Sequence, residues 1–262
     1  MNFHPQASFA TSVNIAAFTI AGEQIYADRS GVLYIPASQT LVVADLHFEK
    51  GSAFAARGMM LPPYDTTATL ARLAQVITFY NPRAVIALGD SFHDRAAAAR
   101  MDPANRRALL ALQKSRDWLW IAGNHDPAPP DNLGGEARAV FMLGPLTFRH
   151  EPKPGAATGE IAGHLHPVVR VAGRGASLRC RCFASDGQRC IVPAFGAYAG
   201  GLNIRDQAFA GLFGPQLAVH ALGRERVFAI HPAACQPDSQ SRRKITVATQ
   251  PNNSAKPPVA SP

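Results

Sequence analysis

The chain has 262 residues, 47% of them hydrophobic, and a formal net charge of +8 at pH 7. This length allows one substantial core, so a single domain is expected, and no apolar run reaches the roughly 18 residues that a membrane span needs. The basic charge favours polyanionic partners but is equally compatible with a generally basic soluble protein. The N-terminus has no signal-peptide pattern, which favours a reducing, cytoplasmic setting. In a reducing setting, the four cysteines are expected to be free thiols: Cys180, Cys182, Cys190 and Cys235.

Apolar runs bounded by turn residues predict the strands, and apolar residues at helical spacing predict the helices. In chain order, we expect strands at residues 18–20, 24–27, 31–35 and 41–44, and then a helix at 64–79. A strand at 84–88 follows, and then an arginine-rich helical stretch at 95–116 that is interrupted at Pro103. Further strands are expected at 118–122, 146–148, 160–162, 178–184, 189–192 and 227–230.

Strands alternate with helices early in the chain and dominate later, which predicts an α/β fold with a mixed sheet rather than a simple doubly wound one. After residue 233 the composition shifts to Gln, Ser, Asn, Pro and Lys, which is typical of disordered segments. The sequence therefore predicts one domain over residues 1–233 and a polar tail over 234–262.

Five of the predicted strands are followed at once by side chains of types that commonly bind metal ions. In strand order these are Asp45 with His47, then Asp90, Asn124, His150, and His164 with His166. Because ligand sites in open α/β sheets lie beyond the carboxyl ends of the strands, we expect these side chains to converge. One Asp-x-His or Gly-Asp pair usually means little, but the whole ordered series is hard to obtain by accident. A lone histidine such as His150 carries the weakest signal.

The mixture of carboxylate, amide and imidazole groups suits Mn, Fe or Zn better than Mg or Ca. Two divalent ions that clamp a phosphoryl group lie about 3.5–4 Å apart, and a bridging anion holds them together. Asp90 is the natural candidate for that bridge. Asp45 and His47 alternate across one residue, so an extended backbone is expected to direct both toward one ion. His164 and His166 repeat this spacing.

His125 directly follows a candidate ligand and directly precedes Asp126. We expect His125 to point the opposite way from Asn124, toward the phosphate, where it would protonate the leaving oxygen. Asp126 is expected to fix the tautomer of His125. For His93, a hydrogen-bonded structural role is at least as well supported as contact with a substrate.

These motifs resemble those of the calcineurin-like metallophosphoesterases. Within that superfamily the chain is similar to the ligase-associated DNA damage response phosphoesterases, the PdeM family, over roughly residues 21–230. The motif Gly123-Asn124-His125-Asp126 belongs to the superfamily series. The further segments that carry the likeness to the PdeM family are Val43-Ala44-Asp45-Leu46-His47-Phe48-Glu49-Lys50-Gly51, Leu61-Pro62-Pro63-Tyr64-Asp65-Thr66, Leu88-Gly89-Asp90-Ser91-Phe92-His93-Asp94, Gly163-His164-Leu165-His166-Pro167 and Pro193-Ala194-Phe195-Gly196. One departure is His93, which stands where the superfamily often has an acidic residue.

The resemblance implies a four-layer α-β-β-α sandwich with mixed sheets and a binuclear site, with manganese as the expected metal. It implies that one ion is held by Asp45, His47, Asp90 and His166, and the other by Asp90, Asn124, His150 and His164. His125 would be the general acid. The implied reaction is cleavage of DNA phosphodiester bonds by a metal-activated water, in the manner of an endonuclease. The implied setting is bacterial DNA repair, with a dedicated ligase and helicase.

Two other functions remain open on the sequence alone. Hydrolysis of nucleotides or other small phosphorylated molecules is an enzymatic alternative that the sequence discriminates poorly. A degenerate, non-catalytic scaffold is disfavoured because no candidate ligand is missing. Cys180, Cys182 and Cys190 lack an evident fourth ligand for zinc. Eight arginines follow the second and fifth metal motifs and could track a nucleic-acid backbone, although solvated surfaces explain most of them. They are Arg95, Arg100, Arg106, Arg107, Arg170, Arg174, Arg179 and Arg181.

Overall fold

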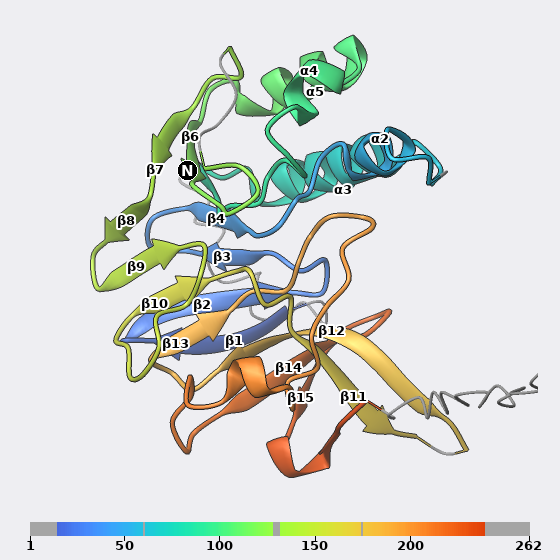
Figure 1. Ribbon diagram of the computed structural model, residues 1–262. Helices are drawn as coiled ribbons and strands as arrows, with labels where there is room; N and C mark the ends of the chain where they lie inside the picture. Colours follow the sequence, from blue (N-terminus) through green and yellow to red (C-terminus); the bar gives the residue numbers. More distant parts are fainter. Residues whose placement is uncertain (1–14, 60, 128–131, 174, 239–262) are drawn as a thin grey trace, which may run out of the picture.

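The computed structural model describes residues 15–59, 61–127, 132–173 and 175–238. Two β-sheets pack face to face, and helices cover the outer face of the first sheet (Figure 1). The strands of the first sheet follow one another in chain order: β1 (Ile15–Ile20), β2 (Glu23–Asp28), β3 (Leu33–Ile35), β4 (Thr40–Val43), β5 (Ala84–Ala87), β6 (Asp117–Ile121) and β7 (Glu136–Arg138). Strands β4 to β7 run parallel. The carboxyl ends of β4, β5 and β6 therefore meet at one edge.

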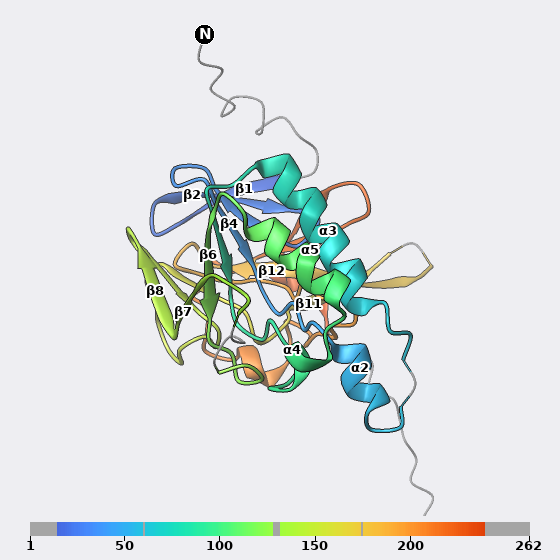
Figure 2. The same cartoon turned by 90° about the horizontal axis from the view of Figure 1, so that it is seen from above.

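The helices of the described residues are α2 (Lys50–Ala55), α3 (Asp65–Tyr80), α4 (Ala97–Arg100) and α5 (Pro103–Gln113). Helix α3 buries Leu70, Leu73 and Ile77, as their spacing predicts. Figure 2 shows α3 and α5 side by side above the sheet. The helical stretch expected at 95–116 is divided in two, because Pro103 starts a new helix and the Asp102 carboxylate caps it. None of the described helices is long and apolar enough to cross a membrane.

The second sheet has the strand order β15–β14–β12–β13–β10–β9–β8, and β11 and β16 extend it from β12. Its strands are β8 (Val140–Leu143), β9 (Leu146–Arg149), β10 (Glu160–Ala162), β11 (Val168–Ala172), β12 (Ser177–Ser185), β13 (Arg189–Ile191), β14 (Ala218–Leu222), β15 (Val227–Ile230) and β16 (Cys235–Gln236). Strands β9, β10 and β13 are parallel neighbours. A buried ion pair joins β10 to β13, with 2.6 Å between Arg189 Nε and Glu160 Oε1. An isolated parallel bridge between Ala44 and Ala194 links the end of β4 to the segment that follows β13.

Both faces of the first sheet are buried at its central strands, β4 and β5. Val43 and Val85 pack in the cluster that includes helix α3, whereas Val42 and Ile86 pack in the cluster between the sheets. Because successive side chains of a strand point to opposite faces, a strand buried on both faces must be apolar throughout. This is why β4 and β5 appear in the sequence as continuous apolar runs.

The α/β fold with two mixed sheets is confirmed, but the fourth layer of the expected α-β-β-α sandwich is not an α-helix in the described part of the chain. Segment 203–217 follows the outer face of the second sheet, and its regular element is the short 3₁₀-helix η1 (Gln207–Phe209). Phe209 and Leu212 from this segment pack against strand residues in a third core cluster. Gly211, Gly214 and Pro215 disfavour a longer helix there.

The ordered chain extends past the domain boundary expected at residue 233. Strand β16 pairs with β11, and this places the buried Cys235 opposite Val171. Just beyond, Asp238 forms an ion pair with Arg179, with 3.2 Å between Arg179 Nε and Asp238 Oδ1. A single apolar side chain anchors this strand, so the polar composition of the segment concealed it. The rest of the expected tail, residues 239–262, lies outside the described residues.

Candidate metal centre

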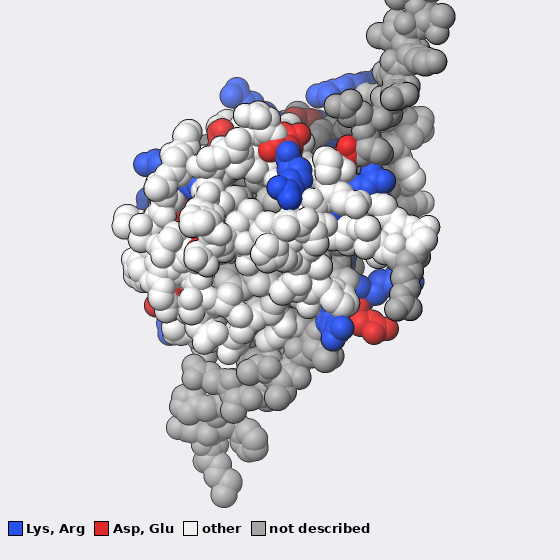
Figure 3. Space-filling model, turned by 90° about the horizontal axis from the view of Figure 1, so that it is seen from below, with Lys and Arg blue, Asp and Glu red and all other residues white. Residues whose placement is uncertain are grey.

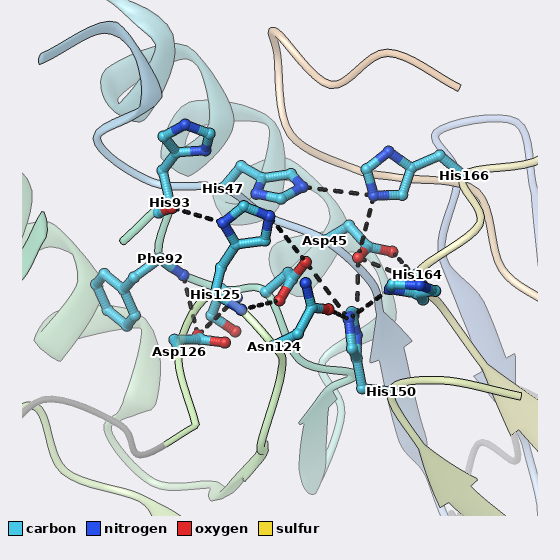
Figure 4. Close-up of polar contacts among 12 residues, drawn as sticks. Asp45, His47, Phe92, His93, Asn124, His125, Asp126, His150, His164 and His166 are labelled. Atoms are coloured by element: carbon cyan, nitrogen blue, oxygen red, sulfur yellow. Dashed lines mark hydrogen bonds and ion pairs between the residues drawn. The ribbon is translucent and has the colours of Figure 1, made fainter. Parts of the chain in front are cut away.

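Side chains that follow β4, β5, β6, β9 and β10 meet where these strands end (Figure 4). The structure brings together the whole set of ligands expected from the sequence: Asp45, His47, Asp90, Asn124, His150, His164 and His166. Six of them form two groups, and within each group the donor atoms all lie within 4.8 Å of one another. The first group is Asp45, His47 and His166, and the second is Asp90, His150 and His164.

In the first group, two imidazoles meet edge-on beside a buried carboxylate. His166 Nε2 lies 3.2 Å from Asp45 Oδ1 and 3.4 Å from His47 Nε2. The other ring nitrogen of His166, Nδ1, lies 3.2 Å from the carbonyl oxygen of Gly200. A backbone carbonyl at this position holds the Nδ1 proton and leaves Nε2 free to bind a metal ion.

The second group is built in the same way and includes the amide of Asn124. His150 Nε2 lies 2.7 Å from Asn124 Oδ1, 3.1 Å from His164 Nδ1 and 3.4 Å from Asp90 Oδ2. Its Nδ1 lies 2.8 Å from the carbonyl oxygen of Leu88, at the end of β5. His150, the weakest candidate in the sequence, is thus directed by backbone toward the middle of the group.

Burial and charge set the protonation of this centre. Burial lowers the pKa of His47 to about 3, against the opposing effect of the Asp45 charge. Burial also acts on His150, but its hydrogen bond to Asp90 and the charges of Asp45 and Asp90 outweigh it and raise the pKa of His150 to about 9. For Asp90, the contacts with His150 and His125 outweigh burial and lower its pKa. A buried, ionised carboxylate beside several imidazoles is an arrangement that a bound cation stabilises.

Several ligand candidates have a backbone conformation that non-glycine residues rarely adopt. The φ angles are positive at Asp45 (52°), His47 (46°), Asp90 (45°), His164 (67°) and His166 (45°). The extended backbone expected across Asp45–His47 and His164–His166 is therefore wrong. Asp45 and His47 do share one donor group, whereas His166 belongs to the first group and His164 to the second, so the expectation that this second pair serves one ion is wrong as well. Left-handed backbone conformations just after the strands direct these side chains toward one another, and such conformations concentrate at functional sites.

His125 lies at the open side of the centre. Its side chain is 41% exposed, and its Nε2 lies 3.8 Å from Asp90 Oδ2. Its Nδ1 lies 2.9 Å from the backbone carbonyl oxygen of His93, and the two rings stack with 5.3 Å between centroids. Its backbone N–H donates to Asp90 Oδ1 at 2.9 Å. The side chain is thus held beside the ligands without belonging to either metal group.

Asp126 does not contact the His125 ring in the structure, so its expected role in fixing the tautomer is wrong. Asp126 Oδ2 instead accepts hydrogen bonds from the backbone N–H groups of Ser91 and Phe92, at 2.8 and 3.0 Å. Burial raises the pKa of Asp126 to about 7, despite these two hydrogen bonds. Asp126 thus supports the loop that follows Asp90, and the carbonyl of His93 orients the imidazole.

The chain is similar to a known protein family and to a solved structure. The calcineurin-like phosphoesterase family matches residues 38–173, which include the end of β4 and the ligands up to His166. The chain belongs to this family. The structure is also similar to the crystal structure of the nuclease MPE from Pseudomonas putida, with a TM-score of 0.65 and 31% sequence identity over 83% of this chain and 100% of the other. No curated protein matched the chain.

The donor groups fit what a calcineurin-like phosphoesterase requires. They combine buried carboxylates with imidazoles whose second ring nitrogen, in His150 and His166, is already occupied by a backbone carbonyl. Nitrogen and carboxylate oxygen donors together suit divalent transition metals. This calcineurin-like phosphoesterase is accordingly a metal-dependent enzyme with two groups of residues that can hold divalent ions.

Sequence reasoning about this calcineurin-like phosphoesterase missed the backbone contacts of the site. The carbonyls of Leu88, His93 and Gly200 orient three imidazoles, and no residue type signals such a contact in advance. A second missed feature is Glu49, whose carboxylate accepts hydrogen bonds from Ser52 and Thr66 and ties α2 to α3 beside the centre. The sequence segments around Glu49 and Thr66 carry part of the family likeness, but their residue types do not predict this contact.

Proposed function

We propose that this protein is a metal-dependent nuclease that hydrolyses phosphodiester bonds in DNA. The observation that carries the proposal is the placement of two adjacent donor groups, with Asp90 in one of them and His125 beside it. A pair of metal sites is the usual arrangement for in-line displacement at phosphorus. The likeness to a nuclease supports a nucleic acid as the substrate.

Each ion would be held by one donor group, with Asp90 shared between the two. Asp45, His47 and His166 would complete one set. Asn124, His150 and His164 would complete the other, and manganese is the proposed metal, with iron or zinc as alternatives. When bound, such ions supply an acidified water molecule and neutralise the charge of the phosphate.

The chain itself supplies the proton for the leaving oxygen. The contact with the His93 carbonyl holds a proton on Nδ1 of His125, so Nε2 is the atom that exchanges a proton with the substrate. Its 41% exposed side chain lies where a substrate can reach it. Asp126 acts as a positioning residue, because it fixes the backbone of Ser91 and Phe92 just after Asp90.

The finer biological setting is also part of the proposal. We propose single-stranded DNA as the substrate, a cytoplasmic location and a role in bacterial DNA repair with a dedicated ligase and helicase. These expectations come from the family likeness of the motifs around Asp45, Asp90 and His164. Hydrolysis of nucleotides or other small phosphorylated molecules is the alternative function.

A substrate panel tests the proposal. The full-length protein, loaded with manganese, is incubated at one fixed salt concentration with single-stranded DNA, duplex DNA, mononucleotides and a phosphopeptide. Fixed salt is needed because the affinity for polyanions depends strongly on it. We expect cleavage of single-stranded DNA and little turnover of the other substrates. Turnover restricted to mononucleotides or to the phosphopeptide would falsify the DNA proposal while leaving the metal site intact.

A further inference from the structure

A second basic site lies outside the metal centre. A cavity of about 560 Å³ opens between α3, the β2–β3 turn, β12 and the β14–β15 turn. Four arginines line it, Arg29, Arg72, Arg181 and Arg224, together with one carboxylate, Asp28. The lining therefore carries a clear excess of positive charge in a concave place, which is the electrostatic requirement for binding an anion.

Two of these arginines converge on one backbone atom. Arg72 Nη2 and Arg181 Nη2 lie 3.2 and 3.5 Å from the carbonyl oxygen of Ser30. Arg181 also donates from Nη1 to the carbonyl oxygen of Ala194 at 2.8 Å, and the Arg72 guanidinium lies over the ring of Phe195 at 4.4 Å. Both cations are thus held in place by carbonyls and by an aromatic face.

The two guanidiniums have no carboxylate partner in the described part of the chain. Asp28, the acidic residue of the cavity lining, already accepts hydrogen bonds from Tyr80 and from the backbone N–H of Ser30. Burial together with the charge of Arg72 lowers the pKa of Arg181 to about 10. An anion that accepts hydrogen bonds from both groups stabilises half-buried, mutually repelling cations of this kind.

A further polar group in the cavity points to a ligand. The hydroxyl of Ser30 is buried and has no hydrogen-bond partner among the described residues. Buried polar atoms are nearly always paired in folded proteins, so an unpaired hydroxyl beside two guanidiniums calls for an explanation. An anion in the cavity is placed to accept hydrogen bonds from the hydroxyl and from the guanidinium N–H groups that the backbone carbonyls do not use.

We propose that this cavity binds a backbone phosphate of the DNA strand, at a nucleotide away from the one that is cleaved. The proposal rests on the proposed function. Guanidinium forks match phosphate geometry better than ammonium groups do. Phe79, which is 56% exposed, lies beside the arginines in the cavity lining, and an aromatic face next to cations is typical of single-strand binding surfaces.

The cavity and the metal centre share one segment of chain. Arg181 holds the carbonyl of Ala194, and Arg72 lies over Phe195. In the same segment, Phe195 N–H donates to the carbonyl of Ala44, and Gly196 N–H donates to that of Asp45. This one segment of chain therefore separates a DNA strand bound at the cavity from the first metal group.

Other basic surfaces are weaker candidates. Arg100 and Arg179, two of the arginines that the sequence offers as possible nucleic-acid contacts, form ion pairs with Asp94 and Asp238. The face in Figure 3 shows basic side chains that are scattered, mostly toward the rim, rather than joined into a track. Of the arginines in that set that the structure describes, Arg181 lines this cavity.

Oligonucleotide binding without metal tests the proposal. A fluorescent single-stranded oligonucleotide is titrated in EDTA, so that cleavage and metal-bound phosphate do not contribute. The variants are Arg72→Gln and Arg181→Gln, each of which keeps a hydrogen-bond donor. Arg226→Gln is the control, since it removes the same charge outside the cavity. For each lost phosphate contact we expect affinity to fall about fivefold near 0.1 M salt and the log–log salt slope to fall by about 0.7.

The outcomes separate this proposal from others. Loss in Arg72→Gln and Arg181→Gln but not in Arg226→Gln, with metal content equal to that of the original protein, supports the site. Equal losses in all three variants would overturn it in favour of general electrostatics. A loss of metal in the two cavity variants would overturn the site, because it would show that Arg72 and Arg181 only support the segment beside Asp45. If inorganic phosphate competes as strongly as unlabelled oligonucleotide, the ligand of the cavity is a small phosphate and the proposal of a bound DNA strand is overturned. Cavity-dependent binding without DNA cleavage would refute the nuclease function and leave the site standing.

Discussion

The ring nitrogen Nδ1 of His125 lies 2.9 Å from the backbone carbonyl oxygen of His93, although the two residues come from loops that follow different strands. The contact fixes which nitrogen of His125 carries a proton, and it places Nε2 toward Asp90. Since His93 acts through its carbonyl, its own side chain is not needed for this contact.

Replacing His125 with Ala should remove the proton donor and leave the ligands in place. We expect kcat on DNA to fall by about 10²- to 10⁴-fold, the usual contribution of general acid catalysis. Metal content, measured by elemental analysis, should stay unchanged. A diester with a p-nitrophenolate leaving group needs little protonation, so its hydrolysis should fall much less. An equal loss on both substrates would argue against an acid role.

Replacing Asp90 with Ala should abolish hydrolysis and cost most of the bound metal, because Asp90 is the proposed shared ligand. Asp90→Asn keeps the shape but removes the charge, so it should retain an intermediate metal content. Metal stoichiometry and turnover are measured together on the same samples. A metal-loaded, active Asp90→Ala protein would be incompatible with a binuclear site.

Gly123 is packed too closely for any side chain. A Cβ atom there would lie 2.2 Å from the backbone nitrogen of Asp90 and 2.3 Å from its Oδ1. Gly123→Ala should therefore destabilise the fold by about 1–3 kcal/mol, as overpacking does, and reduce metal affinity. The measurements are urea unfolding and metal titration. Gly200→Ala is the matched control, since nothing lies within 4 Å of a Cβ atom at that position. Similar losses in both variants would show that packing at Gly123 is not the cause.

His220 should make the fold sensitive to mild acid. Its ring stacks on Phe18 with 4.7 Å between centroids, its Nδ1 is buried without a partner in the described chain, and burial lowers its pKa below the ordinary 6.5. The unfolded chain therefore binds a proton more readily than the folded one does. The stabilisation is fully present above about pH 6.5 and is lost as the pH falls toward the folded pKa.

His220→Phe should consequently lose less stability than the original protein between pH 7 and pH 5. Chemical unfolding in EDTA at several pH values measures this. The exposed His231, which caps η2 (Pro232–Ala234), provides a comparison in His231→Asn. The prediction fails if the pH dependence of His220→Phe equals that of the original protein.

The strands that carry the ligands were predictable because they are buried on both faces, so β4 and β5 appear as apolar runs. Two strands that the sequence did not predict lack this pattern. Strand β7 (Glu136–Arg138) is exposed throughout, and β8 (Val140–Leu143) alternates between exposed and half-buried residues. Helix α2 was missed because it is six residues long and contains Gly51 and Ser52. Its place depends on tertiary contacts, such as the hydrogen bond from Gly51 N–H to Asp65.

The set of side chains in the site was predictable from residue types, and the way in which they are oriented was not. Adjacency in sequence suggested that Asp126 orients His125, but the backbone turn between them sends the carboxylate to Ser91 and Phe92. The prediction of an extended backbone at Asp45-x-His47 was wrong for the same reason, since tertiary contacts determine the backbone angles at the end of a strand.

The left-handed residues of the centre restrict how this site can change during evolution. A substitution at such a position must keep the chemistry and also tolerate a positive φ, which β-branched and bulky residues do poorly. Asn, Asp and Gly tolerate it best. A descendant that abandons catalysis while keeping the fold should therefore carry Asn, Asp or Gly at these positions more often than Val, Ile or Thr. The positions concerned are Asp45, His47, Asp90, His164 and His166.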